Sequence, residues 1–127
     1  LHGTRVRDLT WFGIAQATSE TDADTMWWQR SRLGGAGVVA VSRDNGDLAG
    51  IVSEDQLQAV PEHQRPYVPL GQLMVPFSQL AKADLDEDLA DVLSRLNPRT
   101  PVVTVWRDGK LLGVVPKKRL LARMQTG

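Results

Sequence analysis

The residues of this chain that could do chemistry are two histidines and a short run rich in carboxylates. His2 and His63 lie far apart in the sequence, and neither has a partner at the spacing that a metal site or a catalytic base needs. The five carboxylates that fall close together are Asp84, Asp86, Glu87, Asp88 and Asp91. They stand where a helix is expected to begin, and carboxylates stabilise the positive end of a helix dipole. We therefore assign them to helix stabilisation and predict no metal.

Motifs for covalent or phosphate chemistry are absent. The chain has no cysteine, which excludes thiol catalysis, disulfides and cysteine-ligated zinc. It contains neither a Walker-type phosphate loop nor a Gly-x-Ser-x-Gly nucleophile motif, and the Gly-Gly-Ala-Gly stretch at 34–37 is explained as a turn that enters a strand. The sequence therefore argues against an enzyme.

Composition narrows the class of protein and its partners. Hydrophobic residues make up 42% and charged residues 24% of the 127 positions, as in an ordinary folded domain. Fifteen basic residues balance fifteen acidic ones, so we expect no nucleic-acid partner. No apolar run approaches the roughly 18 residues that span a bilayer, so we expect no direct membrane insertion. The absence of cysteine favours the cytoplasm, and the start without Met favours a piece of a longer protein.

An internal duplication organises the chain. Residues 50–57 recur 63 positions later as 113–120, each time after a polar turn, Asn45-Gly46 and Asp108-Gly109. Further upstream the offset becomes 64, and the matching pairs of segments are 38–41 with 102–105, 22–24 with 86–88, and 7–9 with 71–73. One extra residue near Ser42 accounts for the change of offset. A duplication of this kind indicates two copies of one structural unit.

Each copy is predicted to run strand, helix, strand, strand, helix. A valine-rich run, an Asn-Gly or Asp-Gly turn and a second apolar run indicate a hairpin. The helix before the second hairpin is indicated by apolar residues at helical spacing, Leu89, Val92, Leu93 and Leu96. Its counterpart at 21–33 is less regular. After the hairpins, Ser53 can cap a helix to about Val60, and Pro116 can open one to about Met124.

These elements predict an α/β (α+β) fold of two pseudo-symmetric β-α-β-β-α repeats, at 5–60 and 69–124. Residues 61–68 form the linker, in a segment with three prolines and no periodicity. A half of this size buries only about 60% of its unfolded surface. We therefore expect the two sheets to pack face to face around a pseudo-twofold axis and to share a core.

The order of elements, with Gly-Ile-Val-Ser at 50–53 and Gly-Val-Val at 113–115, resembles the CBS domain family over 5–60 and 69–124. The resemblance implies a tandem CBS pair, or Bateman module. Such modules typically bind AMP, ADP, ATP, S-adenosylmethionine or related ligands between the repeats and regulate an attached catalytic or membrane domain. It implies no other cofactor and no catalysis, and the parent we favour is a site-2-protease-type membrane metalloprotease with this module at its cytosolic C-terminal end.

The resemblance also points to ligand-binding positions. Members that hold a ribose commonly show Gly, two apolar residues, Ser or Thr, two variable residues and Asp. In the first copy Ser53 fits, but Gln56 replaces the Asp, and Asp55 stands one residue too early, about 100° away on a helix. In the second copy Pro116 and Arg119 replace both polar residues.

A ligand is therefore expected at Ser53 and Gln56, with backbone near Ala36, Gly37 and Val38 available for the base. The alternative is that Ser53 is an ordinary helix cap. A glutamine retains part of the lost affinity by hydrogen bonding to a sugar hydroxyl.

Tryptophans indicate a second surface. The alignment places Trp27 opposite Asp91, an exposed position, so Trp27 and Trp28 are candidates for a homodimer interface through the helices. The alternative is that both fill space within the monomer. Three functions remain open: a ligand sensor, a ligand-free dimerisation or protein-interaction module with a degraded site, and a small enzyme.

Overall fold

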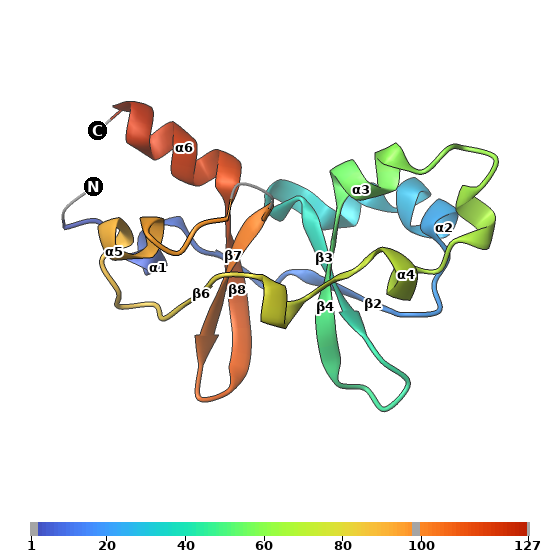
Figure 1. The fold of residues 1–127 in the computed structure, drawn as a ribbon, viewed down its shortest axis with the longest axis horizontal. Helices are drawn as coiled ribbons and strands as arrows, with labels where there is room; N and C mark the ends of the chain where they lie inside the picture. Colours follow the sequence, from blue (N-terminus) through green and yellow to red (C-terminus); the bar gives the residue numbers. More distant parts are fainter. Residues whose placement is uncertain (1–2, 98–99, 127) are drawn as a thin grey trace. The chain divides into compact units, whose positions relative to one another are not determined.

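The computed structural model describes residues 3–97 and 100–126, and it has a mixed α/β fold with two four-stranded sheets (Figure 1). The chain divides into two compact units. One is the continuous segment Ile14–Phe77, and the other combines the chain on either side of it, Leu1–Gly13 and Ser78–Gly127.

The continuous unit is built on the sheet β2-β3-β4-β5. Its strands are β2 (Ala15–Thr18), β3 (Val38–Ser42), β4 (Leu48–Ser53) and β5 (Val75–Pro76), of which β2 and β3 are parallel and the other pairs antiparallel. Its helices are α2 (Ala23–Trp28), the 3-10 helix η1 (Arg30–Ala36), α3 (Glu54–Ala59), the 3-10 helix η2 (Arg65–Tyr67) and α4 (Leu70–Leu73). Its core joins both sheet and helices, through Ala23, Met26, Leu33, Val39, Val41, Val52, Leu57 and Leu70.

The discontinuous unit repeats this plan on the sheet β1-β8-β7-β6. Its strands are β1 (Trp11–Phe12), β6 (Lys82–Ala83), β7 (Val102–Arg107) and β8 (Lys110–Pro116). Its helices are α1 (Val6–Leu9), α5 (Leu89–Leu93) and α6 (Lys117–Thr126), and the 3-10 helix η3 (Phe77–Gln79) begins at the boundary between the units. Its own core contains Val6, Leu9, Ala83, Leu85, Leu89, Val92, Val103, Val105, Val115 and Leu120.

Both predicted hairpins and the helices that follow them are confirmed. The second hairpin turns over two residues, Asp108 at φ 53° and Gly109 at φ 75°, as its Asp-Gly sequence predicts. Two helices differ from expectation. The predicted helix at 21–33 is α2 followed by η1, with a kink at Gly34, and α5 ends at Leu93 although Leu96 still packs against the core.

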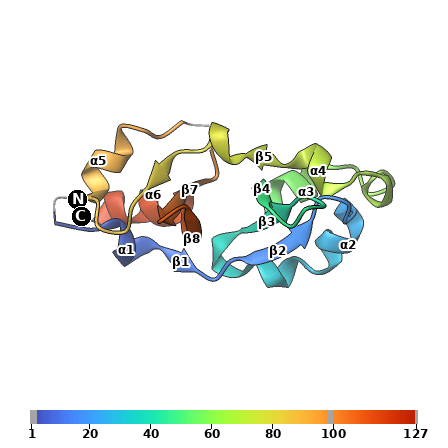
Figure 2. The same cartoon turned by 90° about the horizontal axis from the view of Figure 1, so that it is seen from below.

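The compact units do not coincide with the sequence copies. β5 comes from the second copy, yet it pairs with β4 of the first, and β1 comes from the first copy, yet it pairs with β8 of the second. Figure 2 shows both edge strands beside these partners. The repeat boundaries at 5–60 and 69–124 thus describe the duplication and not the packing, because the first segment of each copy is exchanged.

The alignment of 22–24 with 86–88 is wrong by two residues. Asp22 caps α2 and Asp88 caps α5, and these two caps are 66 positions apart. The strands before them show the same offset, since Gln16 pairs with Ala40 and Lys82 with Thr104. Several acidic residues between 84 and 91 match an N-cap equally well in sequence, and only the hydrogen bond to the helix start decides among them.

Two equivalent glycines make the exchanged strands possible. A methyl group added at Gly50 of β4 would overlap the backbone carbonyl of Val75 in β5, and one added at Gly113 of β8 would overlap the carbonyl of Trp11 in β1. Neither obstacle is a flexible side chain that could move aside. These glycines begin the Gly-Ile-Val and Gly-Val-Val stretches because the neighbouring backbone passes directly against them.

We expect Gly50→Ala and Gly113→Ala each to lower the free energy of unfolding by about 1–3 kcal/mol, since the edge strand must shift to admit the methyl group. Urea unfolding followed by circular dichroism measures this. Gln16→Ala, at an exposed position of β2, is the control and should change stability by less than about 0.5 kcal/mol. Equal stability of Gly50→Ala and wild type would contradict the conclusion that a glycine is needed where the edge strand passes.

Candidate ligand site

Ser53 lies at the corner where β4 ends and α3 begins, and its side chain is a helix cap. Its hydroxyl accepts a hydrogen bond from the backbone N–H of Gln56 at 3.2 Å, and the Gln56 side-chain oxygen accepts from the backbone N–H of Ser53 at 2.9 Å. This reciprocal arrangement is a capping box. Only 7% of Ser53 is exposed. The capping interpretation of Ser53 therefore has direct support in the structure.

The Gln56 side chain is engaged on both of its polar atoms. Its oxygen also accepts from the Ser53 hydroxyl at 3.3 Å, and its Nε2 donates to the backbone carbonyl of Leu73 at 2.6 Å. Leu73 is the last residue of α4, where a short helix leaves carbonyls without partners. The Gln56 amide, which was predicted to bind a ribose, thus forms hydrogen bonds within its own unit.

The predicted base-binding backbone lies beside this corner. Gly37 ends η1 in the left-handed region, at φ 67°, and its carbonyl accepts from the N–H of Glu54 at 2.9 Å. Val38 pairs with Ser53 across β3 and β4. Ala36 and Val38 are buried. The structure therefore brings all five predicted residues of the first copy together, namely Ala36, Gly37, Val38, Ser53 and Gln56.

The second copy has the same corner with different chemistry, and it lies in the other compact unit. The N–H of Lys117 donates to the carbonyl of Pro101 at 3.0 Å, which is the counterpart of the Glu54–Gly37 bond. Pro116 has neither a hydroxyl nor an N–H, so no capping box can form there. Arg119 donates to the carbonyl of Leu9 at 3.1 Å, and its guanidinium lies 5.5 Å from the centre of the Trp11 ring.

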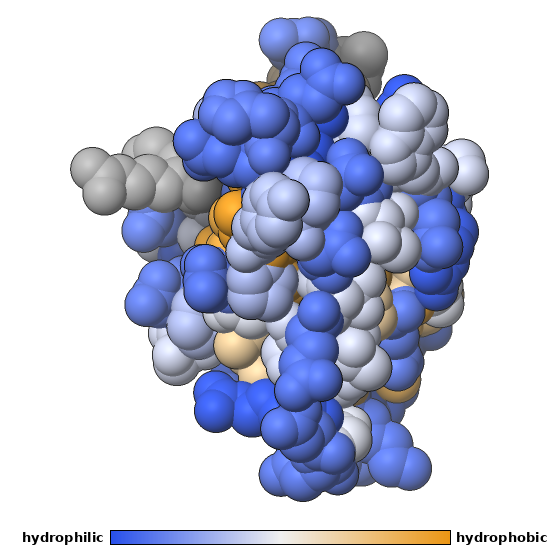
Figure 3. All heavy atoms as spheres, turned by 90° about the vertical axis from the view of Figure 1, so that its right-hand side faces the viewer, coloured by the Kyte–Doolittle hydropathy of each residue, from blue (hydrophilic) through white to orange (hydrophobic). Residues whose placement is uncertain are grey.

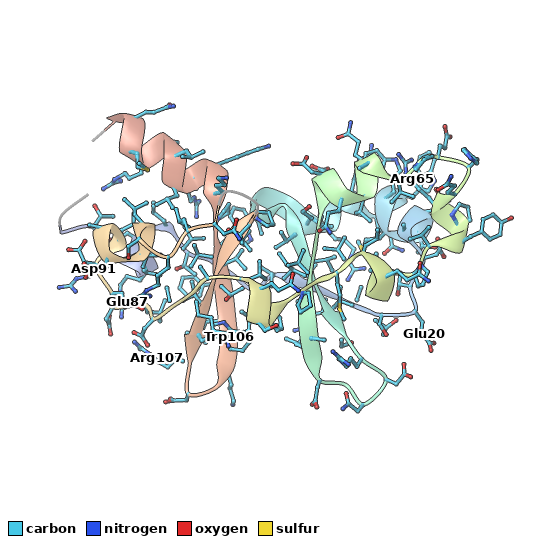
Figure 4. All side chains as sticks on the ribbon, in the orientation of Figure 1. Glu20, Arg65, Glu87, Asp91, Trp106 and Arg107 are labelled. Carbon is cyan, nitrogen blue, oxygen red and sulfur yellow. The ribbon has the colours of Figure 1, made fainter. Side chains whose placement is uncertain are left out.

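The Trp27 side chain packs within its own unit. Guanidinium groups of Arg30 and Arg65 lie 4.1 and 4.4 Å from the centre of its ring, and the ring packs against the core. Figure 4 shows Arg65 close to α2, and Arg65 also donates to the carbonyl of Val60 at 3.1 Å, just after α3. The counterpart of Trp27 at the 66-residue offset is Leu93, which also packs against its core. The exposure predicted from Asp91 is therefore wrong for Trp27.

Trp28 and Tyr67 are the large aromatic residues that this unit leaves in solvent. They are 74% and 84% exposed. Trp28 lines an open depression of about 420 Å³ with Arg30, Ser31 and Glu54. Figure 3, which faces the right-hand side of Figure 1, shows a mainly hydrophilic surface. Tyr67 lies in the proline-rich segment, where no apolar periodicity marks it in the sequence as a surface residue of interest.

The acidic run before α5 forms ion pairs and one cap. Asp88 accepts from the N–H of Ala90 at 2.9 Å and caps α5. Arg107 lies 3.1 Å from Asp84 and 2.8 Å from Asp86, while Arg7 of α1 pairs with Asp86. Figure 4 labels Arg107 and Glu87 in this region; Glu87 pairs with Arg95. Within 3–97 and 100–126, no three metal-ligating side chains are grouped to hold an ion.

Hydrogen bonds lower the pKa of three carboxyl groups in this run. For Asp86 the main cause is the hydrogen bond from Arg7, followed by that from Arg107. For Asp84 the main cause is the backbone N–H of Asp86, followed by Arg107. For Glu87 it is the hydrogen bond from Arg95. The ionised forms of all three are thus favoured in the folded state.

Comparison with known proteins finds a family match in the second part of the chain. Residues 70–126 match the model of the CBS domain. Two CBS-domain structures resemble nearly the whole chain. One is ATU1752 from Agrobacterium tumefaciens, with a TM-score of 0.73 at 16% identity over 97% of this chain and 95% of that one. The other is TA0289 from Thermoplasma acidophilum, with a TM-score of 0.74 at 22% identity over 94% and 68%.

A third similar structure is the cytosolic domain of the Mg²⁺ channel MgtE in complex with ATP, with a TM-score of 0.65 at 17% identity over 91% of this chain. The chain spans 46% of that domain and 60% of protein MJ1004. At these identities the likeness shows the fold. Curated proteins gave no match. Within the described residues, no helix has the length and apolar character needed to cross a membrane.

We expect the free energy of unfolding to fall as pH drops below about 4, the ordinary range of Asp and Glu. A pKa lowered in the folded state adds stability above the unfolded-state pKa, and this stability is lost as pH falls through the folded-state pKa. Urea unfolding between pH 7 and pH 2.5 measures it. The double variant Arg7→Gln, Arg107→Gln should lose less on acidification than wild type, and Arg43→Gln should behave like wild type. If wild type and the double variant lost the same free energy of unfolding on acidification, the two arginines would not be the cause of the pH dependence.

Proposed function

We propose that the whole chain is the regulatory module of a larger protein, since residues 70–126 match the model of the CBS domain. CBS-domain proteins are commonly regulatory and typically non-catalytic. The shared fold over nearly the whole chain supports a role of that kind for both sequence copies. The module would act by binding a ligand better in one arrangement of the protein than in another, and the shift is limited by that difference in affinity.

We propose that the ligand is an adenine nucleotide or S-adenosylmethionine, held by the first copy. This proposal is supported by the corner where Gly37, Val38 and Ser53 meet. The corner has a side-chain hydroxyl and a backbone carbonyl at the start of a helix. A sugar hydroxyl needs an acceptor, and the Ser53 oxygen has two lone pairs of which the cap uses one. The second copy offers Pro116 and a cation instead. The ATP complex of the similar MgtE domain supports this class of ligand.

The location and the parent protein are part of the same proposal. We propose a cytoplasmic module attached to a catalytic or membrane domain. A site-2-type membrane metalloprotease stays our prediction for that parent, and it rests on the sequence resemblance alone.

A second candidate function is protein interaction without a ligand, through a homodimer or an acceptor protein. Two observations favour it. The Ser53–Gln56 pair is occupied by its own capping box and by Leu73. Trp28 and Tyr67 place rings in solvent on one unit, and tryptophan and tyrosine are enriched where interfaces gain most of their energy.

We expect one of AMP, ADP, ATP and S-adenosylmethionine to raise the unfolding temperature by several degrees at millimolar concentration. A ligand that binds only the folded state adds about 2.7 kcal/mol at 100 times its dissociation constant. Ser53→Ala should abolish the ligand-induced rise, and Asp55→Asn, on the neighbouring face of α3, should retain it. No rise with any of the four in wild type would overturn adenine sensing.

We expect the chain to self-associate through the surface around Trp28, so Trp28→Ala should raise the dimer dissociation constant at least about tenfold. Sedimentation equilibrium over a range of concentrations measures it. Phe12→Ala, which truncates a half-exposed aromatic residue of the other unit, is the matched control and should leave the constant unchanged. A wild-type chain that stays monomeric at the highest concentrations would contradict homodimerisation.

A further inference from the structure

The same hydrogen bond recurs in both copies at the position where the ribose motif is lost. Gln56 and Arg119 are equivalent residues, 63 positions apart, each the third residue of its helix, α3 or α6. Their acceptors, the carbonyls of Leu73 and Leu9, are equivalent as well, and each is the last residue of a four-residue helix. The donor–acceptor distances are 2.6 and 3.1 Å.

The shared property of these two side chains is an N–H donor. A neutral amide and a guanidinium differ in charge, size and shape, yet both donate to the same carbonyl. An ionised aspartate only accepts hydrogen bonds, so it would face the carbonyl oxygen without a proton to share. A side-chain donor to the equivalent carbonyl is therefore what the two copies have in common at this position.

We propose that Gln56 and Arg119 each act as a latch, by which we mean a side-chain donor that holds a backbone carbonyl in place. Each latch lies just before the chain crosses from one compact unit to the other. Leu73 is followed by β5 and by the boundary at Phe77, and Leu9 is followed by β1 and by the boundary at Gly13. The latched carbonyl fixes the start of an edge strand of only two residues in each case. A strand this short has few bonds of its own, so an external donor contributes a large share of its stability.

In the first copy, the Gln56 latch could couple ligand binding to a change in the backbone at Leu73. A ligand hydroxyl can use the Gln56 oxygen only if it displaces the N–H or hydroxyl of Ser53, because these occupy that atom. Such a rearrangement would loosen the bond to Leu73 and free the segment 73–77. This last step rests on the proposed function, and the latch itself does not.

Gln56→Glu tests the latch without any ligand. Glutamate at this position of a capping box still accepts from the Ser53 N–H, so the variant keeps the cap, removes the donor to Leu73 and places a carboxylate oxygen against that carbonyl. We expect amide hydrogen exchange, followed by mass spectrometry at pH 7, to become about three- to tenfold faster in a peptide covering 70–77. Gln58→Glu, which puts the same charge on an exposed position of α3, should leave this peptide unchanged. Unchanged exchange in Gln56→Glu, or an equal increase in Gln58→Glu, would overturn the proposal.

Arg119 provides an independent second arm in the other unit. Arg119→Gln should keep exchange slow in a peptide covering 6–13, because it retains the donor found in the first copy, and Arg119→Glu should speed it up. Equal exchange in these two variants would overturn the latch even if Gln56→Glu failed to fold. Because no nucleotide is present, this outcome is separate from success or failure of adenine binding.

Discussion

Each compact unit is closed by an edge strand from the other sequence copy, and a glycine is what allows that strand to approach. At Gly50 and Gly113 the neighbouring backbone passes where a side chain would stand. The sheet of each unit therefore has four strands although each copy supplies only three of them. Burial of α1 and α4 against the two cores depends on this closure, since Val6, Leu9 and Leu70 enter those cores from the exchanged segments.

The corner between the last strand and the last helix of each copy is held by hydrogen bonds, and in the first copy it is also the place proposed for the ligand. In the first copy the capping box and the Leu73 bond satisfy the polar atoms of Gln56 internally. These internal hydrogen bonds stabilise the fold, but a ligand would have to compete with them for the same atoms. In the second copy the same contact is made by a cation beside Trp11. The proposed ligand site therefore rests on the first corner, where the Ser53 oxygen keeps one lone pair beyond the one used by its cap.

Arginines organise much of what lies around the two cores. Arg65 fastens the proline-rich segment by stacking on Trp27 and donating to carbonyls at the end of α3. Arg7 and Arg107 neutralise Asp86, which joins α1 to the run before α5. Ion pairs at such exposed positions are individually weak. They lie between segments that are far apart in the sequence, while Trp28 stays exposed to solvent.

The sequence by itself determined the duplication, the two hairpins and the helices that follow them, because turn residues and apolar periodicity act over a few neighbouring positions. It also located the corner at Gly37 and Ser53 and left open whether Ser53 caps or binds. Tertiary structure alone decided that β1 and β5 change places, that Asp88 is the cap and that Trp27 is packed while Trp28 is not. It also revealed the donors to Leu9 and Leu73. Each of these depends on a choice among chemically similar partners far apart in the chain, and only the folded backbone brings one of them within hydrogen-bond distance.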